Sequence, residues 1–278
     1  MNTEEINYSV LMSVYYKDNK DWLIECIESM LNQTIKTNDF VIVKDGKLND
    51  ELDFVISEYC KKYSDIFNII ELSENVGLGP ALAIGVKKCK NEIIARMDSD
   101  DISREDRIEK ELKIMQENNL DMVGSNIAEF TDNINNIRAY RILPENNDEI
   151  IKFAKKRNPF GHPSMLLRKS KVLEAGNYRT YYLCEDYDMW IRMFMVKAKA
   201  YNIQENLVYM RISDDFYKRR GGIKYLKSIL KFKTEQFKNG FYSIKDYAIS
   251  SCASIITCLM PNAVRELIYK KILRKKGN

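Results

Sequence analysis

The first hundred residues alternate between short apolar runs and segments whose apolar residues recur at helical spacing. The runs predict β-strands at residues 8–14, 40–43, 67–72 and 92–97. The segments between them predict helices at residues 22–31, 51–63 and from about 79 to 89. Helices between successive strands give parallel pairing with right-handed crossovers. The first half therefore predicts an α/β fold with a mixed, mostly parallel, Rossmann-like central sheet flanked by helices.

The second half of the chain has a less regular pattern. We expect a helix that opens at Ser103, with Asp106 completing a capping box. Apolar runs predict strands at residues 121–127 and 164–167, and helical spacing predicts a helix at residues 185–196. Beyond Gly221 and Gly222 the chain is helical and rich in lysine. We therefore expect one domain over residues 1–222, with two halves that meet near residue 127, and a basic helical extension over residues 223–278.

Composition narrows the class of protein. Hydrophobic residues make up 45% and charged residues 30%, and a net charge of +4 is too small to predict nucleic-acid binding. Six cysteines without a C-x-x-C pair, and acidic, polar N-terminal residues without a secretory pattern, predict a reducing cytosol. The single histidine, His162, excludes a multi-histidine zinc site. Carboxylates would have to hold a divalent cation, which favours Mg²⁺ or Mn²⁺.

Polar residues follow three of the predicted strands directly. Ligands bind beyond the carboxyl ends of parallel strands, and Asp45, Asn75 and Asp98 all lie at such ends. In the run Asp98-Ser99-Asp100, two carboxylates could hold a cation that bridges a bound diphosphate. The alternative is that these side chains cap the next helix, as Ser and Asp often do. Asp45 could accept a hydrogen bond from a base, or could be an ordinary turn residue.

Further candidates lie downstream. Glu185 and Asp186 begin a predicted helix, whose N-terminus favours ionised carboxylates, so one of them could act as a general base or merely as a cap. His162 is more often structural in such a setting, although it could contact substrate. Arg219 and Arg220 suit recognition of a diphosphate, or they form part of a solvated basic face.

Seven motifs together resemble the family 2 glycosyltransferases, which have the GT-A fold. They occur in the order SVLMSVYYKDN, VIVKDG, NVGLGPALAIG, IARMDSDDIS, GHPSMLLRKS, EDYDMW and YMRISDDFYKRRGG. The match spans about residues 8–222 and is most similar to bacterial enzymes that assemble exopolysaccharide, capsule or lipopolysaccharide. The resemblance implies a GT-A catalytic domain, with a nucleotide-sugar half over residues 1–127, an acceptor half over residues 128–222, and the helical extension beyond.

The resemblance also implies roles for individual residues. It implies an inverting transfer from a nucleoside-diphosphate sugar to an acceptor hydroxyl, with Asp186 as base and Glu185 beside it. Asp98 and Asp100 would hold Mn²⁺ or Mg²⁺, with Asp98 also near the ribose. The remaining donor-binding positions are Tyr15, Tyr16, Asp45, Asn75, Gly77, Arg96, Ser99, Arg219 and Arg220. His162 and Trp190 would contact the acceptor, a growing glycan or a lipid-linked sugar.

Two departures from the family pattern concern the donor. Relatives commonly have Asp-Asp-Gly-Ser after the second strand, whereas this chain has Lys44-Asp45-Gly46-Lys47. Relatives often have Ala-Arg-Asn after the glycine loop, where this chain has Ala81-Leu82-Ala83. We expect a UDP- or dTDP-linked donor, and these departures bear on its base and sugar rather than on the reaction class.

The C-terminal extension contains a mainly apolar run at residues 247–260, too short to span a bilayer. The chain then becomes basic, at Arg265, Lys270, Lys271, Arg274, Lys275 and Lys276. Such a tail suits docking on the anionic inner leaflet of the plasma membrane, or a helix pair packed on the preceding domain with a basic edge. The first alternative makes the protein cytoplasmic and peripheral to that membrane.

Two other functions are compatible with parts of this pattern. A nucleotidyltransferase that makes a sugar nucleotide would share the α/β domain and the carboxylate-held cation, but it usually needs an N-terminal Gly-rich loop with Arg and Lys. A non-catalytic nucleotide-sugar-binding module would need no base, whereas this chain has Glu185 and Asp186.

Overall fold

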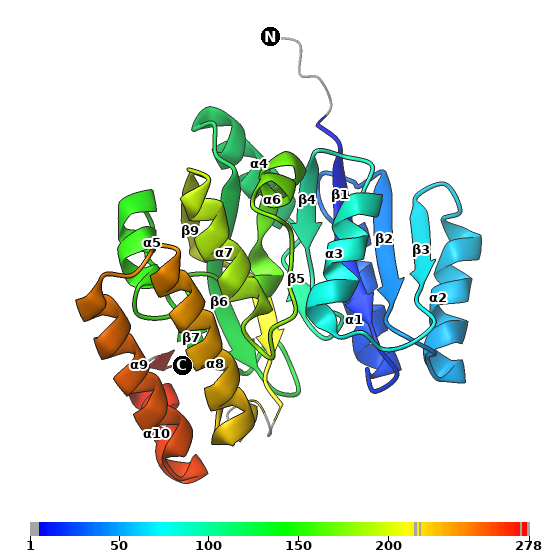
Figure 1. The fold of residues 1–278 in the computed structure, drawn as a ribbon. Helices are drawn as coiled ribbons and strands as arrows, with labels where there is room; N and C mark the ends of the chain where they lie inside the picture. Colours follow the sequence, from blue (N-terminus) through cyan, green and yellow to red (C-terminus); the bar gives the residue numbers. More distant parts are fainter. Residues whose placement is uncertain (1–5, 214–215, 217, 273, 277–278) are drawn as a thin grey trace.

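The computed structural model describes residues 6–213, 216, 218–272 and 274–276. Within these residues, ten strands form one curled sheet, whose main path runs β10-β7-β6-β8-β4-β1-β2-β3, with β9 beside β6 and β5 beside β9. Helices cover both faces (Figure 1). The predicted mixed, mostly parallel sheet flanked by helices is confirmed.

The first half follows the expected alternation closely. Strands β1 (Tyr8–Val14), β2 (Asp39–Lys44) and β3 (Phe67–Glu71) pair in parallel, and β4 (Ile93–Arg96) pairs in parallel with β1. The connecting helices are α1 (Lys20–Leu31), α2 (Asp50–Lys62) and α3 (Leu78–Lys88). Asn19 and Asn49 cap the first two helices by accepting backbone N–H bonds at their N-termini. These elements differ from the predicted ranges only at their ends.

The second half is mixed. Its strands are β5 (Ile102–Ser103), β6 (Met122–Phe130), β7 (Ile137–Arg141), β8 (Leu166–Arg168) and β9 (Ala200–Arg211). Its helices are α4 (Arg107–Glu117), α5 (Asn147–Ala154), the 3-10 turn η1 (His162–Ser164), α6 (Lys169–Glu174) and α7 (Glu185–Met195). Strand β8 runs antiparallel between β4 and β6 and joins the two halves into one sheet.

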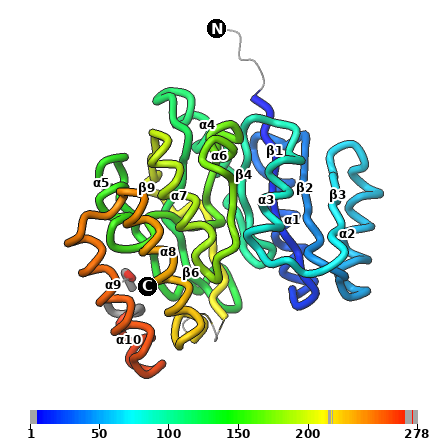
Figure 2. Tube along the Cα trace, viewed as in Figure 1, coloured from blue at the N-terminus to red at the C-terminus, as the bar shows by residue number. Residues whose placement is uncertain are grey.

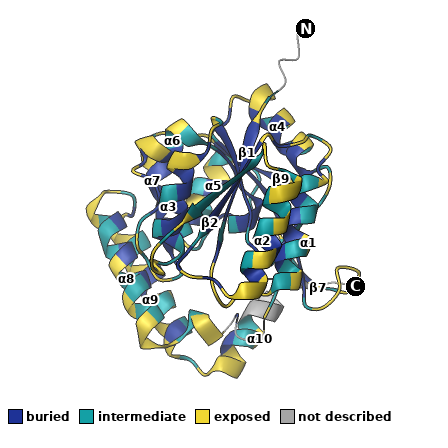
Figure 3. Ribbon diagram, turned by 90° about the vertical axis from the view of Figure 1, so that its right-hand side faces the viewer, coloured by how far each residue is buried: buried dark blue, intermediate teal, exposed yellow. Residues whose placement is uncertain are grey.

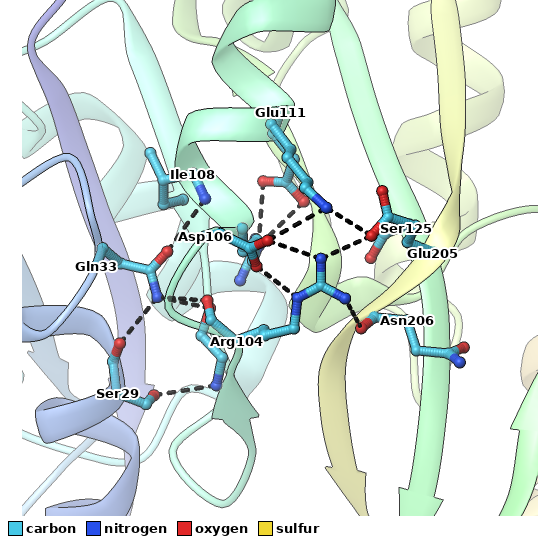
Figure 4. Close-up of polar contacts among 12 residues, drawn as sticks. Ser29, Gln33, Arg104, Asp106, Ile108, Glu111, Ser125, Glu205 and Asn206 are labelled. Carbon is cyan, nitrogen blue, oxygen red and sulfur yellow. Dashed lines mark hydrogen bonds and ion pairs between the residues drawn. The ribbon is translucent and has the colours of Figure 1, made fainter.

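The expected capping box at Ser103 is wrong. Ser103 lies in β5 and is buried, where its hydroxyl accepts a hydrogen bond from Gln33 Nε2 at 3.1 Å. The helix begins four residues later, and Asp106 makes no side-chain cap. Arg104 instead holds Asp106 and Glu205, with Nη2 distances of 2.8 and 2.7 Å (Figure 4). Lys110 contacts the same two carboxylates, and these four residues are called the Arg104 network below.

The C-terminal extension is helical, as expected. After the 3-10 turn η2 (Lys218–Arg220) come α8 (Gly222–Lys238), α9 (Ile244–Leu259) and α10 (Asn262–Ile272), and then β10 (Lys275–Lys276) pairs with β7. These helices lie together on the side of the molecule away from β3 (Figure 2). The Phe232 ring of α8 packs on Tyr187 of α7, with centroids 4.7 Å apart. The division at residue 222 stays a prediction, and α8 shares a hydrophobic core with the preceding part of the chain.

Within the described part of the chain, no helix is long and apolar enough to cross a membrane. Helix α9 contains most of the apolar run at residues 247–260, and several of its apolar side chains are exposed (Figure 3). Arg265 is buried and donates to backbone carbonyls around the α9–α10 turn, so it is structural. The predicted basic side chains of Lys270, Lys271, Lys275 and Lys276 lie outside the described residues.

Candidate active site

The parallel strands β2, β3 and β4, which precede Asp45, Asn75 and Asp98, have their carboxyl ends at one edge of the sheet, as predicted. Asp45 is buried at the end of β2, and its two carboxylate oxygens accept the backbone N–H groups of Val76 and Gly77 at 2.7 and 3.0 Å. Asn75 Nδ2 donates to the Asp45 carbonyl at 3.2 Å. Asp45 therefore fixes the glycine loop. A nucleobase could donate only to the remaining lone pairs of the Asp45 carboxylate.

Gly46 is required where this loop crosses the end of β2. Its φ of +83° lies in the left-handed region, and a Cβ there would approach the backbone nitrogen of Asn75 to 2.7 Å. The Lys44-Asp45-Gly46-Lys47 sequence therefore keeps the glycine that the turn needs. Lys44, which replaces the usual first acid, pairs instead with Asp53 and Glu71 at 2.6 Å.

Asp18 is a residue that the sequence pattern missed. It follows β1, and its Oδ2 accepts bonds from the Ser99 hydroxyl at 2.8 Å and the Tyr15 backbone N–H at 3.1 Å. Burial raises the pKa of Asp18 to about 7, and the charges of Asp100 and Asp98 add to the rise. Ser99 thus joins the ends of β1 and β4, which is a positioning contact rather than a free donor-binding group.

The run Asp98-Ser99-Asp100-Asp101 concentrates negative charge. Burial raises the pKa of Asp100 to about 6, and the Asp98 carboxylate contributes to this rise. Burial and the neighbouring Asp100 hold the pKa of Asp101 well above its usual range. Arg96, almost completely buried, pairs with one oxygen of Asp98, while its Nε and Nη1 have no hydrogen-bond partner among the described residues. Arg96 therefore holds the Asp98 carboxylate from the buried side.

Helix α7 presents the predicted acid pair at its N-terminus. Asp186 accepts a hydrogen bond from Asn158 Nδ2 at 2.6 Å and one from the Tyr187 backbone N–H at 2.7 Å. Burial raises the pKa of Asp186, and burial together with the Asp186 charge raises the pKa of Glu185 to about 7. Burial thus outweighs the helix N-terminus that we expected to favour the ionised forms. A carboxylate whose pKa is raised is a stronger base, which suits proton abstraction near neutral pH.

Two structural contacts fix the direction in which α7 begins. Asp188, completely buried, accepts hydrogen bonds from Arg179, Arg192 and Gln236. Gly79, at the N-terminus of α3, packs closely against the loop that precedes α7. A Cβ at this position would lie 2.4 Å from the Arg179 carbonyl oxygen and 3.2 Å from Glu185 Cβ. The glycine loop and the acid pair are therefore held against each other.

One cavity of about 520 Å³ brings many of the predicted residues together. Its lining includes Asp98, Asp100, His162, Glu185, Asp186, Arg219 and Arg220. These residues come from segments that are spread over more than 100 positions of the sequence. The cavity also contains groups that the sequence pattern missed, namely Arg141, Lys156, Arg157, Asn158 and Lys233.

The two tyrosines predicted to bind the donor are not among the residues that line this cavity. Tyr15 and Tyr16 are 39% and 50% exposed and meet edge to face, with ring centroids 5.8 Å apart. Tyr15 lies close enough to Asp100 and Arg219 for their charges to affect its pKa, which burial raises. This places Tyr15 next to the acidic run.

Trp190 requires a correction. It is completely buried and packs against Phe160, His162 and Tyr178, so it cannot contact an acceptor directly. It lies on the inner face of α7, where it supports the ring of His162. His162 itself lines the cavity, and its Nε2 lies 3.0 Å from the Tyr178 hydroxyl. Burial holds the pKa of His162 well below its usual range, so the ring is neutral.

The arginines at the end of β9 and in the segment after it have two roles. Arg211 is buried, pairs with Glu25 and stacks over Trp22 and Phe130, so it is structural. Arg219 and Arg220 lie in η2 and line the cavity, with Arg220 over the Phe216 ring at 3.8 Å. Asp214 and Asp215, which they flank in sequence, lie outside the described residues.

The donor atoms around Asp98 and Asp100 suit a divalent cation in part. Crowded carboxylates with raised pKa values are destabilised by their own charges, and a cation would relieve this. Among the described residues, however, no three His, Cys, Asp or Glu side chains form a metal-binding group. A cation bound here would therefore take its remaining ligands from a diphosphate and water, as Mg²⁺ commonly does.

Comparisons with known proteins agree with this geometry. Residues 9–176 match the sequence model described as glycosyl transferase family 2. The chain is 35% identical over 276 residues to an Escherichia coli protein named UDP-Gal:alpha-D-GlcNAc-diphosphoundecaprenol beta-1,3-galactosyltransferase, covering 99% of each chain. It is 32% identical to the amylovoran biosynthesis glycosyltransferase AmsE of Erwinia amylovora, over 95% of this chain and 98% of that one.

Solved structures share the fold. Mannosyltransferase PcManGT from Pyrobaculum calidifontis, in complex with GDP-Man and Mn²⁺, superposes with a TM-score of 0.65 at 11% identity. The superposition covers 95% of this chain and 72% of that one. At this identity the likeness concerns the fold alone, and it confirms the predicted GT-A arrangement.

Proposed function

The chain belongs to glycosyl transferase family 2 and transfers a sugar from a glycosyl donor, and from that premise we propose its substrates and mechanism. The donor is a UDP- or dTDP-linked sugar, and the acceptor is a hydroxyl of a lipid-linked sugar or growing glycan in surface polysaccharide synthesis. The observation that supports this most is that Asp186 shares one cavity with the acidic run at Asp98 and Asp100. The family match disfavours a nucleotidyltransferase.

The transfer proceeds with inversion in one displacement. Asp186 takes the proton of the acceptor hydroxyl, and that oxygen forms a bond to the anomeric carbon. The bond from this carbon to the diphosphate oxygen breaks on the opposite side, and its electron pair leaves with the nucleoside diphosphate. Asn158 orients the Asp186 carboxylate through its 2.6 Å hydrogen bond. The charge of Asp186 raises the pKa of Glu185 beside it, so the two carboxyl groups repel each other when both are ionised.

The donor end of the cavity handles negative charge. Arg219 and Arg220 neutralise the negative charge of the departing diphosphate. Tyr15 and Tyr16 flank the nucleobase of the donor. Asp98 and Asp100 would hold Mg²⁺ or Mn²⁺ together with diphosphate oxygens. Such a cation, when bound, stabilises charge that develops on the leaving group.

We further propose that α9 and α10 touch the inner face of the plasma membrane, where a lipid-linked acceptor would lie. Exposed apolar side chains support this, at Ile249, Ile256, Leu259 and Leu267, each at least half exposed. Lys245 adds a basic group at the start of α9. Burial of such side chains among lipid head groups would be favourable.

A ligand screen tests the proposed donor. Unfolding midpoints are measured with UDP-, dTDP- and GDP-sugars, each with and without Mn²⁺. We expect one of the first two nucleotides to raise the midpoint and the cation to enlarge this rise, since ligands that bind only the folded state stabilise it. Stabilisation by GDP-sugars alone, or an equal rise without any divalent cation, would contradict the proposal.

A further inference from the structure

A short loop between α5 and η1 carries Asn158, and side chains bind three of its successive carbonyl oxygens. Arg141, at the end of β7, donates from Nη2 to the Asn158 carbonyl at 3.2 Å and to the Phe160 carbonyl at 2.6 Å. Between them, the Pro159 carbonyl accepts a hydrogen bond from Asn202 Nδ2 at 3.2 Å. The loop lies outside any helix or strand, so these side-chain contacts take the place of a backbone ladder and fix its path.

The path of this loop decides which atom of the Asn158 amide faces the acid pair. Asn158 Oδ1 accepts a hydrogen bond from the Phe160 backbone N–H at 3.2 Å. The amide nitrogen is therefore the atom that donates to Asp186 Oδ2, at 2.6 Å. The other oxygen of Asp186 accepts the Tyr187 backbone N–H. Because both oxygens are held, the lone pairs that remain for a substrate have a fixed direction.

Arg141 also acts on this carboxylate through its charge. Burial raises the pKa of Asp186, whereas the hydrogen bond from Asn158 and the charges of Arg141 and Arg96 lower it. Further charged groups line the same cavity, namely Glu185 on α7, Lys156 and Arg157 after α5, Arg219 and Arg220 in η2, and the acidic run after β4. A change confined to Arg141 leaves all of these in place.

We propose that Arg141 is a positioning residue for the transfer, because by holding the Asn158 and Phe160 carbonyls it keeps the Asn158 amide on Asp186 and so orients the carboxylate. This rests on the proposed function, which takes Asp186 as the base. Arg141 acts through Asn158 and touches no reacting atom in this scheme. Orientation matters for the rate, since a displacement of about 1 Å in a catalytic group can slow a reaction by about 10²-fold.

The first experiment needs no substrate. The full chain is prepared with isotope-labelled aspartate, and the carboxyl signal of Asp186, assigned with Asp186→Asn, is followed by NMR as a function of pH. Arg141→Gln removes a positive charge and loosens the loop, so the pKa of Asp186 should rise above that of the parent. Asn158→Ala should raise it too, because a hydrogen bond to the ionised form is lost. Arg141→Lys keeps the charge and should leave it nearly unchanged.

The same spectra report on the position of the amide. The side-chain NH₂ signal of Asn158, assigned with Asn158→Ala, should move toward that of a free amide in Arg141→Gln, because the loop no longer holds it on Asp186. Arg138→Gln is the matched control. Arg138 lies on the same strand but is exposed and does not line the cavity, so neither signal should change.

The second experiment measures the release of UDP from UDP-galactose, with water in place of the acceptor hydroxyl. Arg141→Gln and Asn158→Ala should each lower kcat by about 10- to 100-fold and leave KM for the donor within about twofold. Arg141→Lys should recover part of the rate. The double variant should be about as slow as Asn158→Ala alone, because two residues that act through one amide are not additive.

The outcomes separate this inference from the proposed function. Undiminished UDP release by Asp186→Asn would contradict the base, and with it the proposed mechanism. If Asp186→Asn is slow but Arg141→Gln changes neither the pKa of Asp186 nor the Asn158 signal, only this inference is overturned. A slow Arg141→Gln with an unchanged pKa, matched by an equally slow Arg141→Lys, would show a purely structural role and overturn it as well. If Arg141→Gln does not fold, Asn158→Ala decides, and an unchanged pKa of Asp186 in that variant would overturn the inference.

Discussion

The Arg104 network and the cavity at the sheet edge are built from the same residue types but differ in charge balance. In the network, Arg104 and Lys110 face Asp106 and Glu205. The hydrogen bond from Arg104 and the charges around it lower the pKa of Asp106 to about 2. In the cavity, burial and neighbouring carboxylates raise the pKa of Asp100 to about 6 and of Glu185 to about 7.

This difference separates groups that serve the fold from groups that await a ligand. A matched network stabilises the folded chain by itself, and its members are satisfied. Crowded like charges destabilise the protein until a ligand of opposite charge binds, which is a common property of functional sites. The comparison predicts that substitutions in the two regions will have opposite effects on stability and on activity.

The largest expected effect is at Asp186. Asp186→Asn keeps the shape of the side chain but removes the base, so transfer should fall by about 10²- to 10⁴-fold. UDP-sugar binding should stay within twofold, which is roughly three-tenths of the free energy of a tenfold change. Product formation and donor affinity are the measurements. Near-normal transfer would contradict the assignment of Asp186 as the base.

The next effect concerns the acidic run. Asp100→Asn should remove most of the cation-dependent stabilisation by nucleotide, which is about 2.7 kcal/mol when the ligand is at 100 times its Kd. Without ligand, the same variant should be as stable as the parent or more so, because a repelling charge is gone. Unfolding midpoints with and without UDP and Mn²⁺ test both parts. If the variant without ligand is clearly less stable than the parent, Asp100 stabilises the fold, as the members of the Arg104 network do, and the proposed repulsion is wrong.

The Arg104 network should behave in the opposite way. Arg104→Gln removes two ion pairs, and because the site is partly exposed we expect a loss of about 1 kcal/mol in unfolding free energy. Activity per folded molecule should not change. Lys61→Gln is the control, since Lys61 pairs with Glu58 on an open helix surface and should leave the midpoint unchanged. Lost activity in folded Arg104→Gln would remove the distinction between the regions.

The smallest effect is a shift in pH dependence. The proposed base must be ionised, and burial raises the pKa of Asp186. The rate of transfer should therefore be maximal above that pKa and should fall as the pH decreases through it. Glu185→Gln removes the neighbouring charge, so the acid limb of the kcat profile should move to lower pH. Movement to higher pH would contradict the coupling between these two carboxylates.

The sequence predicted the nucleotide half well because local patterns and tertiary structure agree there. Apolar runs that end in Asp45-Gly46 or in Asp98 are buried strands bounded by turn residues, and the parallel pairing follows from the helices between them. The acceptor half offers weaker signals. Strand β9 contains the polar run Gln204-Glu205-Asn206, where its register with β6 shifts, so its alternation is broken.

The site residues that were missed depend on contacts between distant segments. Asp18 is an ordinary loop residue until Ser99 donates to it. Arg141 and Asn158 become part of the site only because β7 and the segment after α5 converge on Asp186. Trp190 could have been placed correctly, because Tyr187, Ile191 and Phe194 share its side of the helix by spacing, and all are buried.

The close approach at Gly79 has a consequence for engineering new specificities. Because no side chain fits between the start of α3 and the α7 N-terminus, the glycine loop and the acid pair form one mechanical unit. A chimera that exchanges donor recognition between relatives therefore has to transplant or preserve both flanks of this contact. Diversity in transferred sugar or acceptor should be easier to introduce at the cavity walls than at residue 79.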